Sequence, residues 1–269
     1  MDVFRPTTRR RERGVWAHLS LKPAKRAIVF VHGFAGRGLL TWTRFPDLLQ
    51  GEPKTADYDL IFFEYDSFGR QLGDIVTRLK TFLNNLMTNA SPIVNRGLAL
   101  PDHRPKGFAY DQVLLVAHSL GAVVTRRTLL DYFGNGTPWV PHATFTLFAP
   151  ADMGASGTAL ITEALQGVPF ASLGSAAIKT FFPVLRSLEA GSMPLDRLRK
   201  DTLTLSKDKN TNPHLRAQLV VFAATDSVVE KEKFLVDEKE GSIPGTTHTT
   251  VCKPDDAHTQ AIHFLLGLV

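Results

Sequence analysis

The sequence has almost no cysteine. Its 269 residues include one, Cys252, which has no second cysteine with which to form an intramolecular disulfide or a zinc-binding pair. This excludes a fold held together by internal disulfides and favours a reducing compartment.

Long apolar runs are also missing. The best candidate for a membrane span, residues 164–178, is too short and lies between Glu163 and Lys179. The first fourteen residues, MDVFRPTTRRRERG, contain arginines but no apolar segment of the kind found in a secretory signal. We therefore expect a protein that is not integral to a membrane, with a cytoplasmic location.

A strong charge imbalance is missing as well. The chain has 31 Lys and Arg against 26 Asp and Glu, a net charge of +5, and much of the excess lies in Arg9, Arg10, Arg11 and Arg13. We interpret residues 1–13 as a solvated basic tail, with peripheral contact with an anionic membrane as the alternative. Nucleic acid is not an expected partner, because aromatic and basic residues are not interleaved.

What the sequence does contain is a regular alternation of short apolar strands and amphipathic helices. Strands are expected at residues 15–21, 27–34, 59–66, 113–117, 143–150 and 218–224, and helices at 39–50, 72–86 and 121–132. This order predicts one α/β domain spanning residues 1–269, with a mostly parallel central sheet and helices on both faces. Ligands of such sheets bind at the carboxyl ends of the strands, so the functional residues are expected there.

The stretch VLLVAHSLGAVVTRRTLL, residues 113–130, passes from strand to helix with almost no loop. A sharp turn of this kind needs small residues on both sides, and Ala117 and Gly121 supply them. Ser119 lies at the apex, where its hydroxyl is expected to stand clear of the sheet. The N–H of Leu120 is then placed to stabilise an oxyanion, and Ser119 is the candidate nucleophile.

A second glycine-containing turn, VHGFAG, follows the buried strand at residues 27–31. Gly33 allows the backbone to turn so that the N–H of Phe34 faces the serine as a second oxyanion donor.

A serine nucleophile needs a base, and the base needs a carboxylate to orient it. Asp226 directly follows the strand QLVVFAA and is the preferred acid; Asp152, in FAPADMGAS, also follows a strand and is the alternative. His248 lies in a loop of small residues and is the preferred base. His258 and His263 belong to a C-terminal helical pattern and are the alternatives.

These segments together resemble the α/β-hydrolase serine esterases and lipases. VHGFAG, AHSLG, FAPADMGAS, ATDSVV and THTTVCKP occur in the family's order, and the resemblance extends from Ala27 to the C-terminus. The chain looks most like a lipase-like branch related to serine esterases and inositol-deacylase-like proteins. Two departures are Ala117, where the family usually has glycine, and the aspartate of FAPADMGAS, where many lipases have histidine.

The resemblance implies the α/β-hydrolase fold and hydrolysis of an ester or lipid-like substrate through an acyl-enzyme, with no metal or organic cofactor. It assigns Ser119 as nucleophile, His248 as base, Asp226 as acid, and the N–H groups of Phe34 and Leu120 as oxyanion donors. His118 is expected to be structural. A binding module that has lost catalysis, and an acyltransferase or thioesterase with the same residues, are alternative functions, and the oligomeric state is left open.

An insertion at about residues 156–205 is expected to form a helical cap over the cleft. Apolar residues recur in it at helix-like spacing: Phe170, Leu173, Ala177, Phe181, Leu185 and Leu188. They predict either part of the core or an acyl-binding slot, for which Phe170, Leu173, Phe181 and Leu185 are the candidate contacts. The slot predicts a preference for medium or long acyl esters over acetate.

Overall fold

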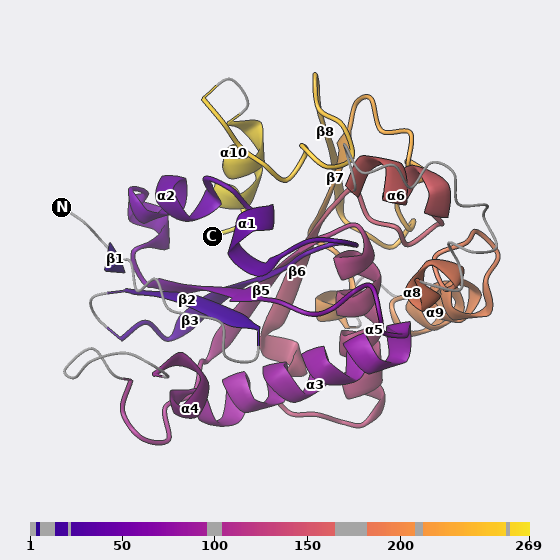
Figure 1. Cartoon of the computed structure of the whole chain (residues 1–269). Helices are drawn as coiled ribbons and strands as arrows, with labels where there is room; N and C mark the ends of the chain where they lie inside the picture. The colour runs from indigo at the N-terminus through magenta and orange to yellow at the C-terminus, as the bar shows by residue number, and fades with distance from the viewer. Residues whose placement is uncertain are drawn as a thin grey trace.

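The computed structural model describes residues 4–5, 14–20, 23–95, 104–164, 182–207, 212–256 and 259–269. Within these residues one sheet of eight strands runs through the molecule in the order β1-β2-β4-β3-β5-β6-β7-β8 (Figure 1). The strands are β1 (Phe4–Arg5), β2 (Val15–Ser20), β3 (Arg26–Val31), β4 (Tyr58–Phe63), β5 (Gln112–His118), β6 (Ala143–Phe148), β7 (Leu219–Ala223) and β8 (Lys239–Ile243).

The sheet is parallel from β4 to β8 and antiparallel at its β1–β2 edge. β1 pairs antiparallel with β2 and β2 with β4, whereas every later pair is parallel. All six residues of β4 are buried, as are five of the six in β3, so these strands show no polar face. Strands without a polar face must be covered on both sides. The predicted mostly parallel sheet is confirmed.

Helices cover both faces of this sheet. The described helices are α1 (Gly38–Thr41), α2 (Phe45–Gln50), α3 (Leu72–Asn89), α4 (Ser91–Val94), α5 (Leu120–Gly134), α6 (Gly157–Ala164), α8 (Pro183–Arg186), α9 (Met193–Leu205) and α10 (Gln260–Leu266). Short 3-10 turns occur at Pro53–Thr55, Val140–His142 and Pro213–Leu215. In Figure 1, α1, α2 and α10 lie on one face, and α3, α4 and α5 on the other. Among the described residues, no helix combines the length and apolarity needed to cross a membrane.

Three local features differ from the sequence expectations. The helix expected over residues 39–50 is two short helices, α1 and α2, because Thr43 between them has a positive φ of 43°. Strand β8 was not expected, since KEGSI is charged and glycine-containing. Within the segment interpreted as a tail, Phe4 and Arg5 pair with β2.

The expected cap is described in part. Its helices α6, α8 and α9 lie at one end of the molecule (Figure 1). Helix α9 packs against α5, where Arg127 binds Asp201 at 2.5 Å. Several residues singled out in the sequence lie outside the described residues: Phe170, Leu173, Phe181, His258, Arg9, Arg10, Arg11 and Arg13.

Candidate active site

The turn between β5 and α5 holds Ser119 in a strained backbone conformation, with φ 54° and ψ −121°. The Ser119 N–H donates to the carbonyl of Phe148 at 3.0 Å, which fixes the turn to the neighbouring strand. Gly121 is required because a Cβ at this position would lie 2.3 Å from the carbonyl oxygen of Val31. The absence of a side chain lets the first turn of α5 pass against the end of β3, as the sequence pattern predicts.

The loop after β3 crosses directly over the serine. A Cβ on Gly33 would stand 2.8 Å from the Cβ of Ser119, so only glycine allows this approach. The buried ring of His32 fixes the loop: its Nδ1 is 2.8 Å from the carbonyl of Gly33, and its Nε2 accepts the N–H of Tyr65 at 3.1 Å. Burial lowers the pKa of His32 to about 4. The neutral ring has the one N–H and one lone pair that these two contacts need.

A continuous series of hydrogen bonds joins three of the predicted residues. Ser119 Oγ lies 2.9 Å from His248 Nε2, and His248 Nδ1 lies 2.9 Å from Asp226 Oδ2. The other carboxylate oxygen of Asp226 accepts the N–H groups of Val228 and Val229 at 2.8 and 3.2 Å. Burial by itself raises the pKa of Asp226, but the bonds from His248 and these N–H groups outweigh it and hold the pKa below its usual value.

Of the two alternative bases, only His263 lies in the described part of the chain, and it has no contact with Ser119 there. His263 is exposed on α10, and His258 is not described. His118 is hydrogen-bonded to the backbone of His248: its Nε2 is 2.8 Å from the carbonyl oxygen of His248. Burial lowers the pKa of His118 to about 3, so the ring is neutral and donates this bond from Nε2.

Asp152, the alternative acid, is engaged elsewhere. Its Oδ2 accepts the Nε–H of Arg126 at 2.9 Å, and both residues are buried. The guanidinium of Arg126 also binds both oxygens of Asp237, at 3.0 and 2.8 Å. Asp152 therefore belongs to a buried ion cluster under α5, which sequence reasoning did not find.

The two predicted oxyanion donors belong to residues next to the serine or in the loop that crosses it. Phe34 follows Gly33 in the loop that crosses Ser119, and Leu120 is the first residue of α5. In the described part of the chain, no acceptor takes the N–H of either residue. The Phe34 ring packs edge-on against Phe68 and Phe182, with centroids 5.3 and 5.7 Å away.

Comparison with known proteins bears on the fold. No family model and no curated protein matches the chain. The lipase BlEst2 of Bacillus licheniformis superposes with a TM-score of 0.56 at 14% identity, covering 94% of this chain and 97% of that one. The α/β hydrolase MGS-MChE2, from a sediment metagenome of the Mar Chica lagoon in Morocco, has a TM-score of 0.55 at 16% identity and covers 94% of each chain. The chain has the α/β-hydrolase fold.

A third structural neighbour is a monoacylglycerol lipase of Paleococcus ferrophilus, with a TM-score of 0.50 at 14% identity. It covers 95% of this chain and 99% of that one. At these identities the likeness concerns the α/β-hydrolase fold alone.

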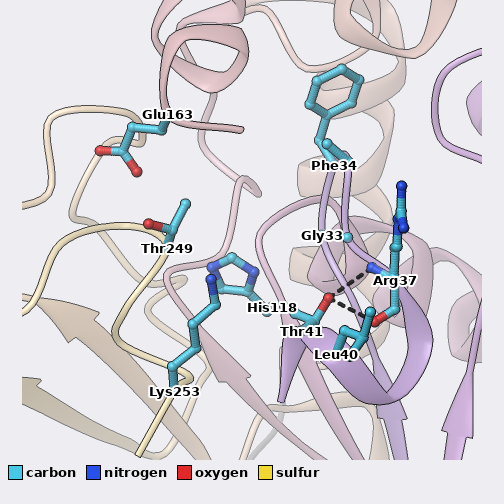
Figure 2. Close-up of a pocket in the computed structure, with 11 residues that line it drawn as sticks. Gly33, Phe34, Arg37, Leu40, Thr41, His118, Glu163, Thr249 and Lys253 are labelled. Atoms are coloured by element: carbon cyan, nitrogen blue, oxygen red, sulfur yellow. Dashed lines mark hydrogen bonds between the residues drawn. The ribbon is translucent and has the colours of Figure 1, made fainter. Parts of the chain in front are cut away.

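A cavity of about 340 Å³ opens beside Ser119 at the carboxyl edge of the α/β-hydrolase sheet (Figure 2). Its walls come from the loop after β3, the residue before the serine, the end of α6 and the loop after His248. The lining residues are Gly33, Phe34, Ala35, Gly36, Arg37, Leu40, Thr41, His118, Glu163, Thr249 and Lys253. Ser119 itself is fully buried and does not line the cavity, whereas its neighbours Gly33 and His118 do.

The remaining expectations concern the acyl contacts and metal ions. Leu185 is 1% exposed and belongs to the main core, and it is not among the residues that line this cavity. Phe182 and Phe68, which the sequence analysis did not select, are the aromatic neighbours of the Phe34 loop. No cluster of three or more His, Cys, Asp or Glu within the described ranges is arranged to hold a metal ion.

Sequence reasoning missed the charged residues of the cavity. Arg37 follows the VHGFAG motif directly, and Lys253 comes five residues after His248. Their positions next to the two motifs could have identified them, because residues next to a strand-end motif lie at the same edge of the sheet.

Proposed function

We propose that the protein is a serine hydrolase that cleaves carboxylic esters through an acyl-enzyme on Ser119. The observation that carries the proposal is the hydrogen-bonded series from Ser119 through His248 to Asp226, with both distances at 2.9 Å. A nucleophile, a base within hydrogen-bond reach and a carboxylate that orients the base are the parts that acyl transfer at a serine requires.

In the first half of the reaction, His248 Nε2 takes the proton of Ser119 Oγ as the oxygen attacks the ester carbonyl. The bond to Asp226 fixes the proton of His248 on Nδ1, which leaves the Nε2 lone pair directed at the serine. Asp226 then stabilises the positive charge that forms on the ring. Its low pKa keeps it ionised for this role.

The carbonyl oxygen gains negative charge during the attack, and the N–H groups of Phe34 and Leu120 are the proposed donors to it. Leu120 contributes in addition the positive end of the α5 dipole. Preorganised donors of this kind each contribute about 2.7–4 kcal/mol to lowering the barrier.

Collapse of the tetrahedral intermediate expels the alcohol, which receives its proton from His248 Nε2. Water then enters, loses a proton to the same nitrogen and attacks the acyl-enzyme, which releases the carboxylic acid and restores Ser119. One base acts in both halves, so the reaction needs no further proton carrier.

The acyl portion is proposed to be of medium or long length. The neighbours described above include a lipase and a monoacylglycerol lipase, which act on lipid esters. Here the exposed edge of Phe68 and the half-buried ring of Phe182 form an apolar surface beside Phe34. The cap residues Phe170, Leu173 and Phe181, which lie outside the described residues, remain candidates for the same slot, whereas Leu185 is buried in the core.

Labelling with a fluorophosphonate tests the proposal. We expect the wild type to be labelled and Ser119→Ala to be unlabelled. Ser156→Ala, which removes an exposed hydroxyl at the start of α6, is the matched control and is expected to label as the wild type does. Hydrolysis of p-nitrophenyl butyrate should follow the same pattern.

Two results would assign a different function. A folded wild type that is neither labelled nor active would favour a binding module. Labelling together with slow release of p-nitrophenol, which becomes faster when an alcohol or thiol acceptor is added and takes the acyl group, would favour an acyltransferase.

A further inference from the structure

The cavity beside Ser119 is lined by two cations, Lys253 and Arg37, for which the described residues supply no ion-pair partner. Lys253 is half-buried and Arg37 is exposed, and no carboxylate in the described part of the chain pairs with either side chain. The nearby Arg44, by contrast, is bound to Asp256. Cations at a cavity wall without internal partners are available to an anionic ligand.

Lys253 lies close to the reacting groups. In Figure 2 its side chain extends toward the ring of His118, whose Nε2 holds the His248 carbonyl. Burial is the main cause of the low pKa of His118, and the positive charge of Lys253 adds to it. The guanidinium of Arg37 lies on the other side of His118, beyond Gly33 and Phe34. An anionic group beside His118 would therefore lie near Lys253, with Arg37 on the far side of the Gly33–Phe34 loop.

A third charged residue, Glu163, also lines the cavity. It lies on the side of Thr249 and Lys253, away from Arg37 (Figure 2). Its Oε2 is buried and has no hydrogen-bond partner among the described residues. A carboxylate here repels an anion, so it confines a negative group to the part of the cavity between Lys253 and Arg37.

The chemistry of the proposed reaction indicates which half of the ester enters this cavity. His248 must protonate the leaving oxygen, so the alcohol portion has to lie on the side of His248 Nε2. Thr249 and Lys253 follow His248 in the chain and line the cavity. The acyl portion then lies against the aromatic surface formed by Phe68 and Phe182.

We propose that the cavity binds the alcohol half of an ester that carries an anionic group, a carboxylate or a phosphate, and that Lys253 and Arg37 recognise this group. The proposal rests on the serine-hydrolase function proposed above. Lys253 is the closer contact to the anionic group, and Arg37 adds a second attraction from the rim of the cavity. The carboxylate of Glu163 repels the anionic group.

A matched pair of esters tests this recognition. Meta-carboxyphenyl butanoate and meta-carbamoylphenyl butanoate have nearly the same shape and differ in charge. The ratio of their kcat/KM values reports charge recognition and cancels general losses of activity. We expect the wild type to favour the anionic ester about twofold to fivefold, as a half-exposed ion pair gives, and to lose the preference in high salt. Glycerol phosphate monobutanoate against glycerol monobutanoate provides the phosphate arm.

Charge variants give the sign of each contribution. Lys253→Gln should bring the ratio close to one, Arg37→Gln should lower it less, and Glu163→Gln should raise it. Lys239 begins β8 at the opposite edge of the sheet and is exposed, so Lys239→Gln is the control for net charge and should leave the ratio unchanged.

The outcomes separate this inference from the function on which it rests. A wild-type ratio of one or less, a ratio unchanged in Lys253→Gln, or an equal drop in Lys239→Gln would overturn anion recognition, while Ser119-dependent hydrolysis of the neutral ester would still support the hydrolase. A preference found only when the carboxylate is on the acyl side, as in monophenyl succinate, would overturn the assignment to the alcohol half. Failure to hydrolyse either ester would refute both proposals.

Discussion

The substitution Asp226→Asn provides a sharp test of the proposed acid, because its neighbours dictate how the amide must lie. Oδ1 of Asp226 accepts two backbone N–H groups, from Val228 and Val229. An asparagine keeps these bonds if its oxygen takes the same place, which turns its NH₂ group toward His248 Nδ1. Nδ1 must then accept, so the proton of the ring moves to Nε2 and the base can no longer take the proton of Ser119.

The expected loss is large, since the ring is held in the wrong tautomer while the rest of the site is intact. We expect kcat to fall by about 10,000-fold, which corresponds to about 5 kcal/mol in the activation barrier. The assay is hydrolysis of p-nitrophenyl butyrate, with the concentration of folded enzyme fixed by circular dichroism. KM should change little, because Asp226 does not line the cavity.

Asp152→Asn is the paired control. Asp152 binds the buried Arg126, which keeps both bonds to Asp237 after the substitution. We therefore expect a loss of about 1–3 kcal/mol in the free energy of unfolding and only a small change in kcat. Near-normal turnover in Asp226→Asn together with a collapse of turnover in Asp152→Asn would refute the reasoning and move the acid to the end of β6.

Three further predictions concern the loop, the buried rings and the acyl chain. Gly33→Ala places a Cβ 2.8 Å from that of Ser119 and should displace an oxyanion donor, lowering kcat by about 100-fold or more with no change in the circular dichroism spectrum; wild-type turnover would contradict the tight approach. The pKa values of His118 and His32, lowered by burial to about 3 and about 4, mean that below pH 6.5 the unfolded state takes up protons that the folded state does not. Urea unfolding should therefore show stability falling by up to about 1.4 kcal/mol per pH unit for each ring as the pH drops from 6.5 to about 4, and His118→Asn should lower the total slope by the share of one ring. Phe182→Asp should weaken the preference for dodecanoyl over acetyl p-nitrophenyl esters, measured as kcat/KM, because each buried methylene contributes about 0.8 kcal/mol; a flat profile in the wild type would refute the acyl surface.

The parts of the site that could be predicted are those encoded by neighbouring residues. The turn around Ser119 depends on Gly121, and the loop over it depends on Gly33, and both requirements are visible in the sequence as small residues at strand ends. Strand β8 was not predicted because KEGSI is an edge strand with an exposed, charged sequence, which among the described strands pairs with β7 alone. Pairing at an edge is decided by contacts rather than by propensity.

The choice between Asp226 and Asp152 shows where local reasoning ends. Both aspartates follow a strand and reach the same edge of the sheet, so the sequence pattern allows either. The structure separates them through Arg126, 26 residues before Asp152 and 111 before Asp237, and no local pattern connects these three positions. The available signal was an arginine within the apolar stretch AVVTRRTLL, because a buried guanidinium must have carboxylate partners.

The same ion cluster explains how the site keeps its geometry across distant segments. Arg126 lies on α5, the helix that begins immediately after Ser119, whereas Asp237 lies on the connection from β7 to β8 that also carries Asp226. One buried guanidinium therefore joins the nucleophile helix to the segment of the acid. A buried ion pair adds little net stability, because desolvation offsets most of the attraction, but breaking it leaves an uncompensated charge. The cluster thus favours the single arrangement in which both carboxylates reach Arg126, and this arrangement also sets the acid segment relative to the serine.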